Sequence, residues 1–411
     1  MMSKEKRRVP KLRFPGFTED WEQRKFGDLY KRVNERNDGT LGRDKWISVA
    51  KMYFQDPDKV QSNNLDTRTY VMKKGDIAFE GNRNNNFKFG RFVLNDIGTG
   101  IISELFPIYR PITEYDLNFW KYAIQLERVM APIFAKCITS SGSSSNKLDH
   151  NHFLNQQLLV PNIKEQKKIG TLLSILNKNI ILYQRKLAHL KLKKKALLQK
   201  LFPKNGVEYP ELRFPGFTDA WEQRKLGECM NSFAYGLNAA AKNYDGMHKY
   251  IRITDIDDET HNFIQSNLTS PDIDFNMDVS DYKLTVGDIV FARTGASVGK
   301  TYLYNPNDGA LYYAGFLIRG KVKEACDAGF IYQNTLTRDY DSFIRITSQR
   351  SGQPGVNSKE YATFRLNIPC KGEQEKISKL LNCLDKLFTL HQRKLDHLKL
   401  QKKALLQQMF V

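Results

Sequence analysis

The sequence has no long apolar run, and its few cysteines show no metal-site or disulfide pattern. No stretch approaches the roughly 20 apolar residues that a membrane-spanning helix needs. The first residues, MMSKEKRRVP, are basic but lead into no apolar segment, so we expect no secretory signal. The five cysteines (Cys137, Cys229, Cys326, Cys370, Cys383) have no CxxC spacing, which argues against a disulfide framework or a structural zinc site and predicts a cytoplasmic protein.

Several motifs of catalysis are also missing. We find no HExxH motif, no FxGxG motif and no Asn/Asp-Pro-Pro-aromatic motif of the kind that amino-methyltransferases use. His150 and His152 are the only clustered histidines, and no cysteine or carboxylate set at ligand spacing accompanies them, so we predict no metal site. We therefore expect a chain that is not an enzyme and that holds no cofactor of its own.

Positive charge, by contrast, is in excess. The 411 residues include 64 Lys and Arg against 45 Asp and Glu, which gives a formal net charge of +19. Such a charge indicates a polyanionic partner, either nucleic acid or an anionic membrane, and a basic protein without such a partner is the alternative. The 41% of hydrophobic residues and the 12% of aromatic residues are typical of a folded protein.

Two segments of the chain occur twice. PKLRFPGFTEDWEQRKFG (10–27) returns as PELRFPGFTDAWEQRKLG (210–227), with fourteen of eighteen residues identical. QRKLAHLKLKKKALLQKLF (184–202) returns as QRKLDHLKLQKKALLQQMF (392–410), with fifteen of nineteen identical. Long stretches that look largely unlike each other lie between these near-copies. One scaffold is therefore used twice to present two different surfaces.

These repeats predict the domain organisation. The connection PKNGVEYP (203–210) has the Pro and Gly content of an exposed linker between the two copies. In chain order, the expected parts are a frame segment (1–28), a variable domain (29–160), a central helix (161–204), a second frame segment (205–228), a second variable domain (229–368) and a distal helix (369–411).

Each predicted long helix carries a heptad seam of apolar residues. Both seams have the same polar interruption, Lys194 in one and Lys402 in the other. The simplest partner for each helix is the other one, so we expect an intramolecular, antiparallel coiled coil with a pseudo-twofold repeat; packing of each helix on a globular core is the alternative. The seam residues are Leu176, Ile180, Tyr183, Leu187, Leu190, Leu384, Phe388, His391, Leu395 and Leu398.

Both variable regions are predicted to be mixed α/β with many short strands, so the fold class is α+β. Candidate strands lie at 46–50, 75–79 and 91–94 in the first region and at 250–254, 287–293, 301–304 and 314–319 in the second. Gly-Asp-Ile-x-Phe occurs at 75–79 and 287–291, and Ile-Thr-Ser at 138–140 and 346–348. We infer that the two regions share a fold and diverge in their loops.

Polar, glycine-containing loops recur at matching places. Residues 81–90 and 293–300 each follow a Gly-Asp-Ile-x-Phe strand, and residues 140–147 and 348–355 lie before the long helices. Arg, Asn and Lys can make paired hydrogen bonds or charge contacts to base edges and phosphates. Polar turns or flexible linkers are the alternative. The candidate DNA-contacting residues are Arg83, Asn84, Asn85, Lys88, Arg91, Ser140, Ser143, Lys147, Tyr235, Arg252, Arg293, Thr294, Ser297, Lys300, Ser348, Arg350 and Gln353.

One of these loops, GASVGKT (295–301), is similar to a phosphate-binding P-loop but is one residue too short. A P-loop leads into a helix whose N-terminus holds the phosphates, whereas Thr301 leads into a predicted strand. We favour a glycine-rich hairpin that approaches nucleic acid. A nucleotide-hydrolysing enzyme and a coiled-coil scaffold without a DNA role are the two alternatives.

The duplicated order of motifs resembles the specificity subunit of type I restriction–modification systems. Each long helix opens with Glu-Gln-x-Lys-Ile, at 165–169 and 373–377. Further matches are YIRITDI (250–256), LTVGDI (284–289), RTG (293–295) and SGQP (351–354). In the first variable region, WISV (46–49) and EGN (80–82) replace the corresponding motifs, which limits the transfer of individual DNA contacts there.

This resemblance implies two target-recognition domains that each read one half of a bipartite, asymmetric DNA sequence, with the paired helices as a ruler between them. It also implies the partners: double-stranded DNA, two methyltransferase subunits on the repeated frame and restriction subunits in the full complex, with no membrane. Catalysis would belong to these partner subunits, which would use S-adenosylmethionine, ATP and Mg.

Overall fold

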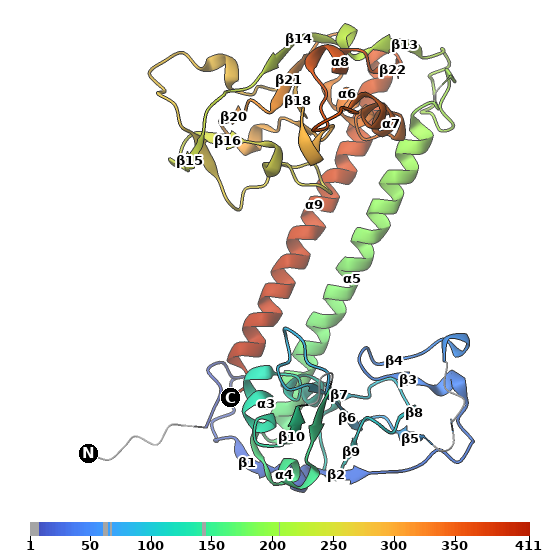
Figure 1. Cartoon of the computed structure of the whole chain (residues 1–411), viewed down its shortest axis with the longest axis vertical. Helices are drawn as coiled ribbons and strands as arrows, with labels where there is room; N and C mark the ends of the chain where they lie inside the picture. Colours follow the sequence, from blue (N-terminus) through green and yellow to red (C-terminus); the bar gives the residue numbers. More distant parts are fainter. Residues whose placement is uncertain (1–7, 61–64, 66–67, 142–144, 205) are drawn as a thin grey trace. The chain divides into compact units, whose positions relative to one another are not determined.

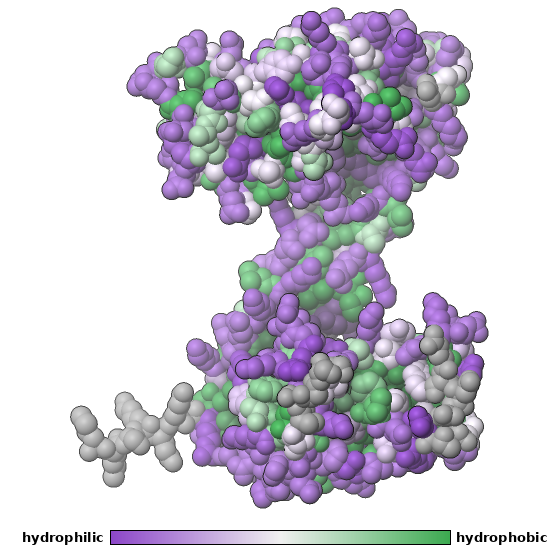
Figure 2. Space-filling model, in the orientation of Figure 1, coloured by the Kyte–Doolittle hydropathy of each residue, from purple (hydrophilic) through white to green (hydrophobic). Residues whose placement is uncertain are grey.

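The computed structural model describes residues 8–60, 65, 68–141, 145–204 and 206–411 (Figure 1). The chain forms two compact units: residues 1–182 with 395–411 (unit 1), and residues 183–394 (unit 2). Each unit holds one variable region together with the beginning of one long helix and the end of the other. Hydrophilic residues cover most of the visible face of each unit (Figure 2).

Unit 1 contains a run of short elements followed by the first part of a long helix. These are β1 (Glu22–Lys25), α1 (Phe26–Leu29), β2 (Tyr30–Val33), β3 (Ile47–Ser48), β4 (Tyr53–Phe54), β5 (Thr69–Met72), β6 (Ile77–Glu80), β7 (Arg91–Leu94), β8 (Gly100–Ser103), β9 (Ile108–Pro111), α2 (Leu117–Ala123), α3 (Glu127–Phe134), β10 (Ile138–Ser141), β11 (Asn146–Leu148), α4 (His150–Asn155), β12 (Gln157–Val160) and α5 (Ile163–Leu201).

Unit 2 repeats this plan with different loops. It comprises the end of α5, then β13 (Glu222–Lys225), β14 (Met230–Tyr235), β15 (Ala241–Asn243), β16 (Lys249–Ile251), β17 (Thr269–Pro271), β18 (Asp288–Ala292), β19 (Thr301–Leu303), β20 (Leu311–Tyr313), β21 (Leu317–Val322), α6 (Ala328–Asn334), α7 (Arg338–Thr347), α8 (Ser358–Ala362), β22 (Arg365–Ile368) and the first part of α9 (Lys371–Gln408).

A four-stranded antiparallel sheet lies at the centre of each unit. Its strand order is β2-β9-β6-β7 in unit 1 and β14-β21-β18-β19 in unit 2. The central strands β6 and β18 are buried along their whole length, because one face contributes to a large aromatic core and the other to a smaller apolar cluster. A strand buried on both faces needs a continuous apolar run, which explains IAF and IVFA in the sequence.

The Gly-Asp-Ile-x-Phe motif builds the turn that leads into this strand. Gly75 and Gly287 have φ of +96° and +90°, a conformation that disfavours side chains with a Cβ. The buried Asp76 accepts a hydrogen bond from the backbone N–H of Lys73 (2.8 Å), and Asp288 accepts one from that of Thr285 (2.8 Å). The motif is therefore structural in both units, as a shared fold requires.

A buried ion pair ties each repeated frame segment to the start of a long helix. In unit 1, the Arg13 guanidinium donates two hydrogen bonds to Glu165, at 2.7 and 2.8 Å. In unit 2, Arg213 makes the same bidentate contact with Glu373, at 2.9 and 2.8 Å. Both carboxylates are fully buried. These contacts explain why the Arg of LRFPGF and the Glu of EQxKI occur together twice.

The glutamine of EQxKI joins the same helix start to the variable region. Gln166 accepts a hydrogen bond from the Asp116 backbone N–H (3.2 Å), and Gln374 accepts one from that of Asp327 (2.9 Å). Asp116 and Asp327 in turn cap the N-termini of α2 and α6. The beginning of each long helix is thus fixed to its unit by two side chains, a Glu and a Gln, that occur in both copies of the repeat.

The carboxyl end of each long helix enters an aromatic core. In unit 1, Phe410 stacks on Phe119 with ring centroids 5.3 Å apart, and it meets the edge of Trp21. In unit 2, Phe202 stacks on Phe330 at the same 5.3 Å and meets the edge of Trp221. The two ends of the repeated helix sequence therefore have the same structural role.

The two long helices pack against each other within each unit. In unit 2, the Tyr183 and His391 rings are in contact (5.4 Å between centroids), and Lys194 binds Asp385 at 2.6 Å; this progression shows that the helices are antiparallel. All ten predicted seam residues are buried or partly buried. The predicted fold class, with two similar α/β domains and an antiparallel helix pair, is confirmed.

The structure corrects several strand predictions. Residues 253 and 254 of the predicted strand 250–254 belong to a 3-10 turn, and residues 315 and 316 of the predicted strand 314–319 form a turn before β21. The predicted strand 46–50 is reduced to β3. The two Ile-Thr-Ser segments also differ, since 138–140 lies in β10 whereas Ile346 and Thr347 end α7. Apolar runs of this length do not by themselves separate a strand from a turn.

The lysine that interrupts each apolar seam has a different hydrogen-bonding partner in the two units. In unit 2, Lys194 makes an ion pair with Asp385. In unit 1, the equivalent Lys402 donates to the amide oxygen of Asn177 (2.8 Å) and lies over the Tyr122 ring, 5.0 Å from its centroid. Burial lowers the pKa of the Lys402 ammonium, because no carboxylate compensates for the lost water.

We predict that Asn177→Asp stabilises unit 1, because it supplies the missing carboxylate opposite Lys402. The expected gain is about 0.5–1 kcal/mol at pH 7, typical of a partly exposed ion pair. The pairing lowers the pKa of the new carboxylate, so the gain is present above pH ~4 and is lost as the pH falls through the folded-state pKa. Urea unfolding of the variant at pH 7 and near pH 4 measures it.

The matched control is Asp385→Asn, which converts the unit 2 contact into the unit 1 type and should lower stability by a similar amount. An Asn177→Asp variant that is less stable than the wild type at pH 7 would contradict this account of the seam.

Candidate nucleic-acid interface

Two predicted loops of unit 2 lie side by side. We call residues 293–300 with 348–355 loop pair 2. Thr294 forms a β-bridge with Gly355, the Gly295 N–H donates to the Pro354 carbonyl (3.0 Å), and the Val356 N–H donates to the Arg293 carbonyl (2.9 Å). The backbone thus joins two segments more than 50 residues apart in the sequence into one polar surface.

The two corresponding loops of unit 1 are joined in the same way. We call residues 81–90 with 140–147 loop pair 1. Asn82 forms a β-bridge with Ser145, and the Asn146 N–H donates to the Gly81 carbonyl (2.9 Å). A Cβ on Gly81 would lie 2.1 Å from the Asn146 carbonyl oxygen, so this close approach requires glycine. Each unit therefore presents one loop pair from the same place in its fold.

An arginine supported by an aromatic ring is the main side-chain feature of loop pair 2. The Arg293 guanidinium lies 5.1 Å from the centroid of the exposed Tyr235 ring, a cation–π geometry. The Tyr235 hydroxyl is 3.2 Å from the Ser358 hydroxyl, and this hydrogen bond lowers the pKa of Tyr235. A planar guanidinium held in this way can present its N–H groups to a base edge or a phosphate. Gln353, also exposed, lies in the adjoining loop.

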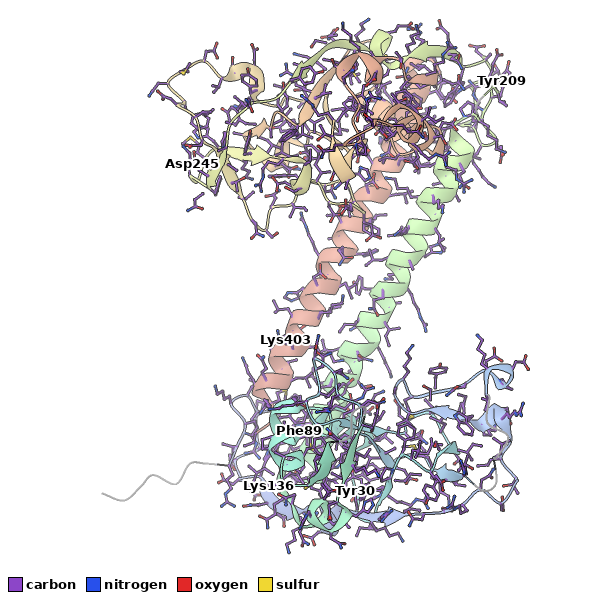
Figure 3. All side chains as sticks on the ribbon, viewed as in Figure 1. Tyr30, Phe89, Lys136, Tyr209, Asp245 and Lys403 are labelled. Atoms are coloured by element: carbon purple, nitrogen blue, oxygen red, sulfur yellow. The ribbon has the colours of Figure 1, made fainter. Side chains whose placement is uncertain are left out.

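Loop pair 1 presents a different set of side chains. Asn84 organises its own loop, because its side-chain oxygen accepts from the backbone N–H groups of Asn86 (2.9 Å) and Phe87 (3.1 Å). Phe89, labelled in Figure 3, packs against the core of unit 1 and anchors the loop. The exposed side chains of its described residues include those of Arg83, Asn85, Lys88 and Lys147.

Several candidate DNA-contacting residues are engaged within the protein. The Lys300 ammonium donates to the Ile256 carbonyl (3.0 Å) and pairs with Asp258, and only 12% of its side chain is exposed. Arg252 makes a bidentate contact with Asp255 at 2.8 and 2.9 Å. These contacts give Lys300 and Arg252 a structural function in holding their segments in place.

Five further candidates are also engaged within the protein or removed in part from its surface. Arg91 donates to Glu80 and to the Ala50 carbonyl, both at 2.7 Å. Arg350 pairs with Glu360, and Ser348 is buried. Thr294 and Ser297 are partly buried within loop pair 2. For Ser140 the structure describes the backbone, which belongs to β10, and Ser143 lies outside the described residues.

The near-P-loop segment does not have the geometry of a nucleotide site. Gly295–Ser297 form a 3-10 turn, and Thr301 begins β19, so the strand predicted after the loop is confirmed. Residues 295–299 also have the GxSxG spacing of a nucleophile elbow. That elbow joins a strand to a helix, whereas this segment joins two strands.

Of the two clustered histidines, His150 is part of the fold. The Nδ1 atom of His150 is 2.6 Å from the Tyr109 hydroxyl, and burial lowers the pKa of His150. Among the residues that the structure describes, no group of three His, Cys, Asp or Glu side chains could hold a metal ion. In the same part of the chain, no helix has the length and apolar character to cross a membrane.

Comparisons with known proteins agree with the resemblance found in the sequence. Residues 218–400 match the model of the type I restriction modification DNA specificity domain. Residues 218–400 are therefore similar to a type I DNA specificity domain, which is the resemblance that the motifs predicted. The match begins in the second frame segment and includes all of loop pair 2. No curated protein matches the sequence.

The whole chain resembles solved specificity subunits in fold. The S subunit of a type I restriction-modification system from M. genitalium is 16% identical, with a TM-score of 0.64 over 98% of this chain and 99% of that one. The HsdS subunit from Thermoanaerobacter tengcongensis is 18% identical, with a TM-score of 0.43 over 97% of each chain. The first of these likenesses shows that both units, and not the matched domain alone, belong to one known fold.

Sequence reasoning did not find the turn residues beside the loop pairs. The Arg293 N–H donates to the carbonyl of Phe316 (3.0 Å), which places Phe316 next to loop pair 2. Phe316 was predicted to lie inside a strand, where its exposure could not be recognised. The Ala-Gly dipeptide at 314–315 is the signal of a turn that could have indicated it.

We predict that Gly299→Ala displaces loop pair 2. Gly299 has φ of +85°, and a Cβ there would lie 2.6 Å from Ile344. The expected cost is about 1–3 kcal/mol of stability from strain and overpacking. Gly352→Ala is the control, because Gly352 lies in the same loop pair with open space around it, and it should change stability by less than about 0.5 kcal/mol. Thermal unfolding distinguishes them, and equal melting temperatures would contradict the placement of Gly299.

Proposed function

We propose that this chain is the specificity subunit of a type I restriction–modification complex and that it reads an asymmetric, bipartite DNA sequence. The observation that carries the proposal is the repetition of one loop-pair geometry in two units with unlike side chains. To read two different half-sites, the two units need loops in the same place that carry different side chains. Unit 1 would read one half-site and unit 2 the other.

The side chains of the loop pairs support reading in the major groove. Arg can bind guanine in a bidentate manner, and Asn and Gln can bind adenine in the same way. Loop pair 2 offers Arg293 and Gln353 for such contacts, whereas loop pair 1 offers Arg83 and Asn85. Lys88 and Lys147 would neutralise phosphates. We infer that the two half-sites differ in their bases.

The net charge of +19 supports an electrostatic contribution to binding. Each phosphate that a Lys or Arg neutralises releases a counterion, so the logarithm of the affinity should fall with the logarithm of salt concentration by about 0.9 per phosphate. This contribution does not depend on sequence, and the loop pairs would add the discrimination between bases.

We further propose that two methyltransferase subunits bind the repeated frame and that restriction subunits join in the full complex. Support comes from equivalent surface positions in the two helix repeats, since Leu192 is 67% exposed and Leu400 is 66% exposed. Two equal surfaces fit two copies of one partner. Catalysis, with S-adenosylmethionine, ATP and Mg, would belong to these partners in the cytoplasm, and this chain would hold no cofactor.

The long helices would determine the distance between the half-sites. Helix α5 has 39 residues and α9 has 38, which correspond to rods of nearly 60 Å at about 1.5 Å per residue. Duplex DNA turns once in roughly 34 Å, so helices of this length suit two contacts on successive major-groove faces.

The experiment that tests the proposed function is genome-wide mapping of N6-methyladenine with and without this chain while its methyltransferase partner is expressed. The proposal expects methylation at one split, asymmetric motif that disappears when the chain is deleted. The same methylation pattern in both strains, with an active partner, would contradict the specificity function.

We predict that Arg293→Ala relaxes recognition at one base pair of the half-site read by unit 2. Loss of a bidentate base contact should cost about 1–3 kcal/mol at that position and leave the other half-site unchanged. Competition binding with a panel of single-base variants measures this. Uniform weakening on all sequences would show instead that Arg293 contacts a phosphate. Arg345→Ala, an exposed substitution on α7, is the control that should leave the base preferences unaltered.

A further inference from the structure

A large apolar side chain is exposed at the same turn in both units. In unit 2, Phe316 is 59% exposed just before β21. In unit 1, Leu105 is 81% exposed, three residues before β9. Exposure of an isolated apolar side chain is common and needs no explanation. Exposure at one equivalent position in two units that otherwise diverge in their loops is a stronger observation.

The equivalence of the two positions follows from the hydrogen bonds around them. The central strand β6 pairs Ile77 with Tyr109, and β18 pairs Ile289 with Gly320, which aligns the two sheets. In this alignment Leu105 corresponds to Phe316. The turns agree as well, since the Phe106 N–H donates to the Ser103 carbonyl (3.1 Å) and the Leu317 N–H donates to the Ala314 carbonyl (2.8 Å).

Both turns lie beside a loop pair. The Phe316 carbonyl accepts from the N–H of Arg293, the residue whose guanidinium lies over Tyr235. In unit 1, the Pro107 carbonyl accepts from the Phe79 N–H (3.0 Å), so the turn that carries Leu105 meets the end of β6 where loop pair 1 begins. Each apolar side chain therefore stands at the edge of a polar surface.

The structure assigns Phe316 and Leu105 to apolar base contact: we propose that each packs against the C5-methyl group of a thymine in the half-site read by its own unit. The inference rests on the proposed function. The thymine methyl is the one apolar group at the floor of the major groove, and it is the natural partner of an apolar side chain placed among hydrogen-bonding ones.

The size of the effect follows from the area of one methyl group. Removing a methyl from an apolar contact weakens binding by roughly three- to fivefold. Replacing thymine by uracil in a duplex removes that methyl and leaves the base pairing unchanged. The contact can therefore be tested from the DNA side and from the protein side independently.

The experiment uses the full complex of this chain with its methyltransferase subunits and a duplex that contains the mapped target. Each thymine of the target is replaced by uracil in turn, and the dissociation constant is measured. The wild-type complex should lose three- to fivefold at one thymine in each half-site. The Phe316→Ala complex should lose that sensitivity in the unit 2 half-site alone, and the Leu105→Ala complex in the unit 1 half-site alone.

Control variants are available at the opposite ends of the same sheets. Val286, 75% exposed before β18, and Ile112, 49% exposed after β9, are also exposed apolar side chains but lie away from the loop pairs. Val286→Ala and Ile112→Ala complexes should retain the wild-type response to uracil. Phe316→Leu keeps an apolar side chain, so it should retain part of the uracil sensitivity that Phe316→Ala loses.

The inference is overturned if no thymine-to-uracil change weakens the wild-type complex, or if Phe316→Ala weakens binding equally on every duplex. It is also overturned if Phe316→Ala keeps the full uracil response. These results differ from failure of the proposed function, in which the wild-type complex would prefer no sequence at all. A preferred sequence that is indifferent to thymine methyl groups would contradict this inference only.

Discussion

The buried ion pair between the frame segment and the long helix is the constraint on which the rest of the structure depends. Arg13 with Glu165, and Arg213 with Glu373, fix where each helix begins relative to its unit. Removing one partner of such a pair leaves an uncompensated buried charge, at a cost of about 3–5 kcal/mol. The frame therefore tolerates little change, which is why these residues recur in near-identical segments while the regions between them have diverged.

A rigid frame and a sheet buried on both faces leave the loops as the variable part. The central strands β6 and β18 end at the loop pairs, so a fully buried strand of each unit positions the loops in which the two units differ. The glycines at close approaches, such as Gly81, hold the paired loops together without restricting the side chains around them. The same scaffold can thus carry Arg293 on Tyr235 in one unit and a cluster of Asn, Arg and Lys in the other.

The sequence predicted those parts of the structure that follow directly from the spacing of apolar residues and from repeated segments. Heptad spacing located both long helices, and the duplicated motifs indicated two copies of one fold. Individual side-chain roles were harder to predict. Lys300 lies in an expected loop and Arg252 in an expected strand, and their acidic partners, Asp258 and Asp255, could not be assigned from sequence. Phe316 was missed because an apolar run gives the same signal for a buried strand and for an exposed turn beside it.

The most direct test of the account is an exchange of residues 229–368 for the equivalent region of a known type I specificity subunit, followed by mapping of N6-methyladenine. If each unit reads its own half-site from a common frame, one half of the methylated motif should change while the other half and the spacer length stay the same. A change in both halves, or in the spacer, would contradict the division of the chain into an invariant frame and two independent readers.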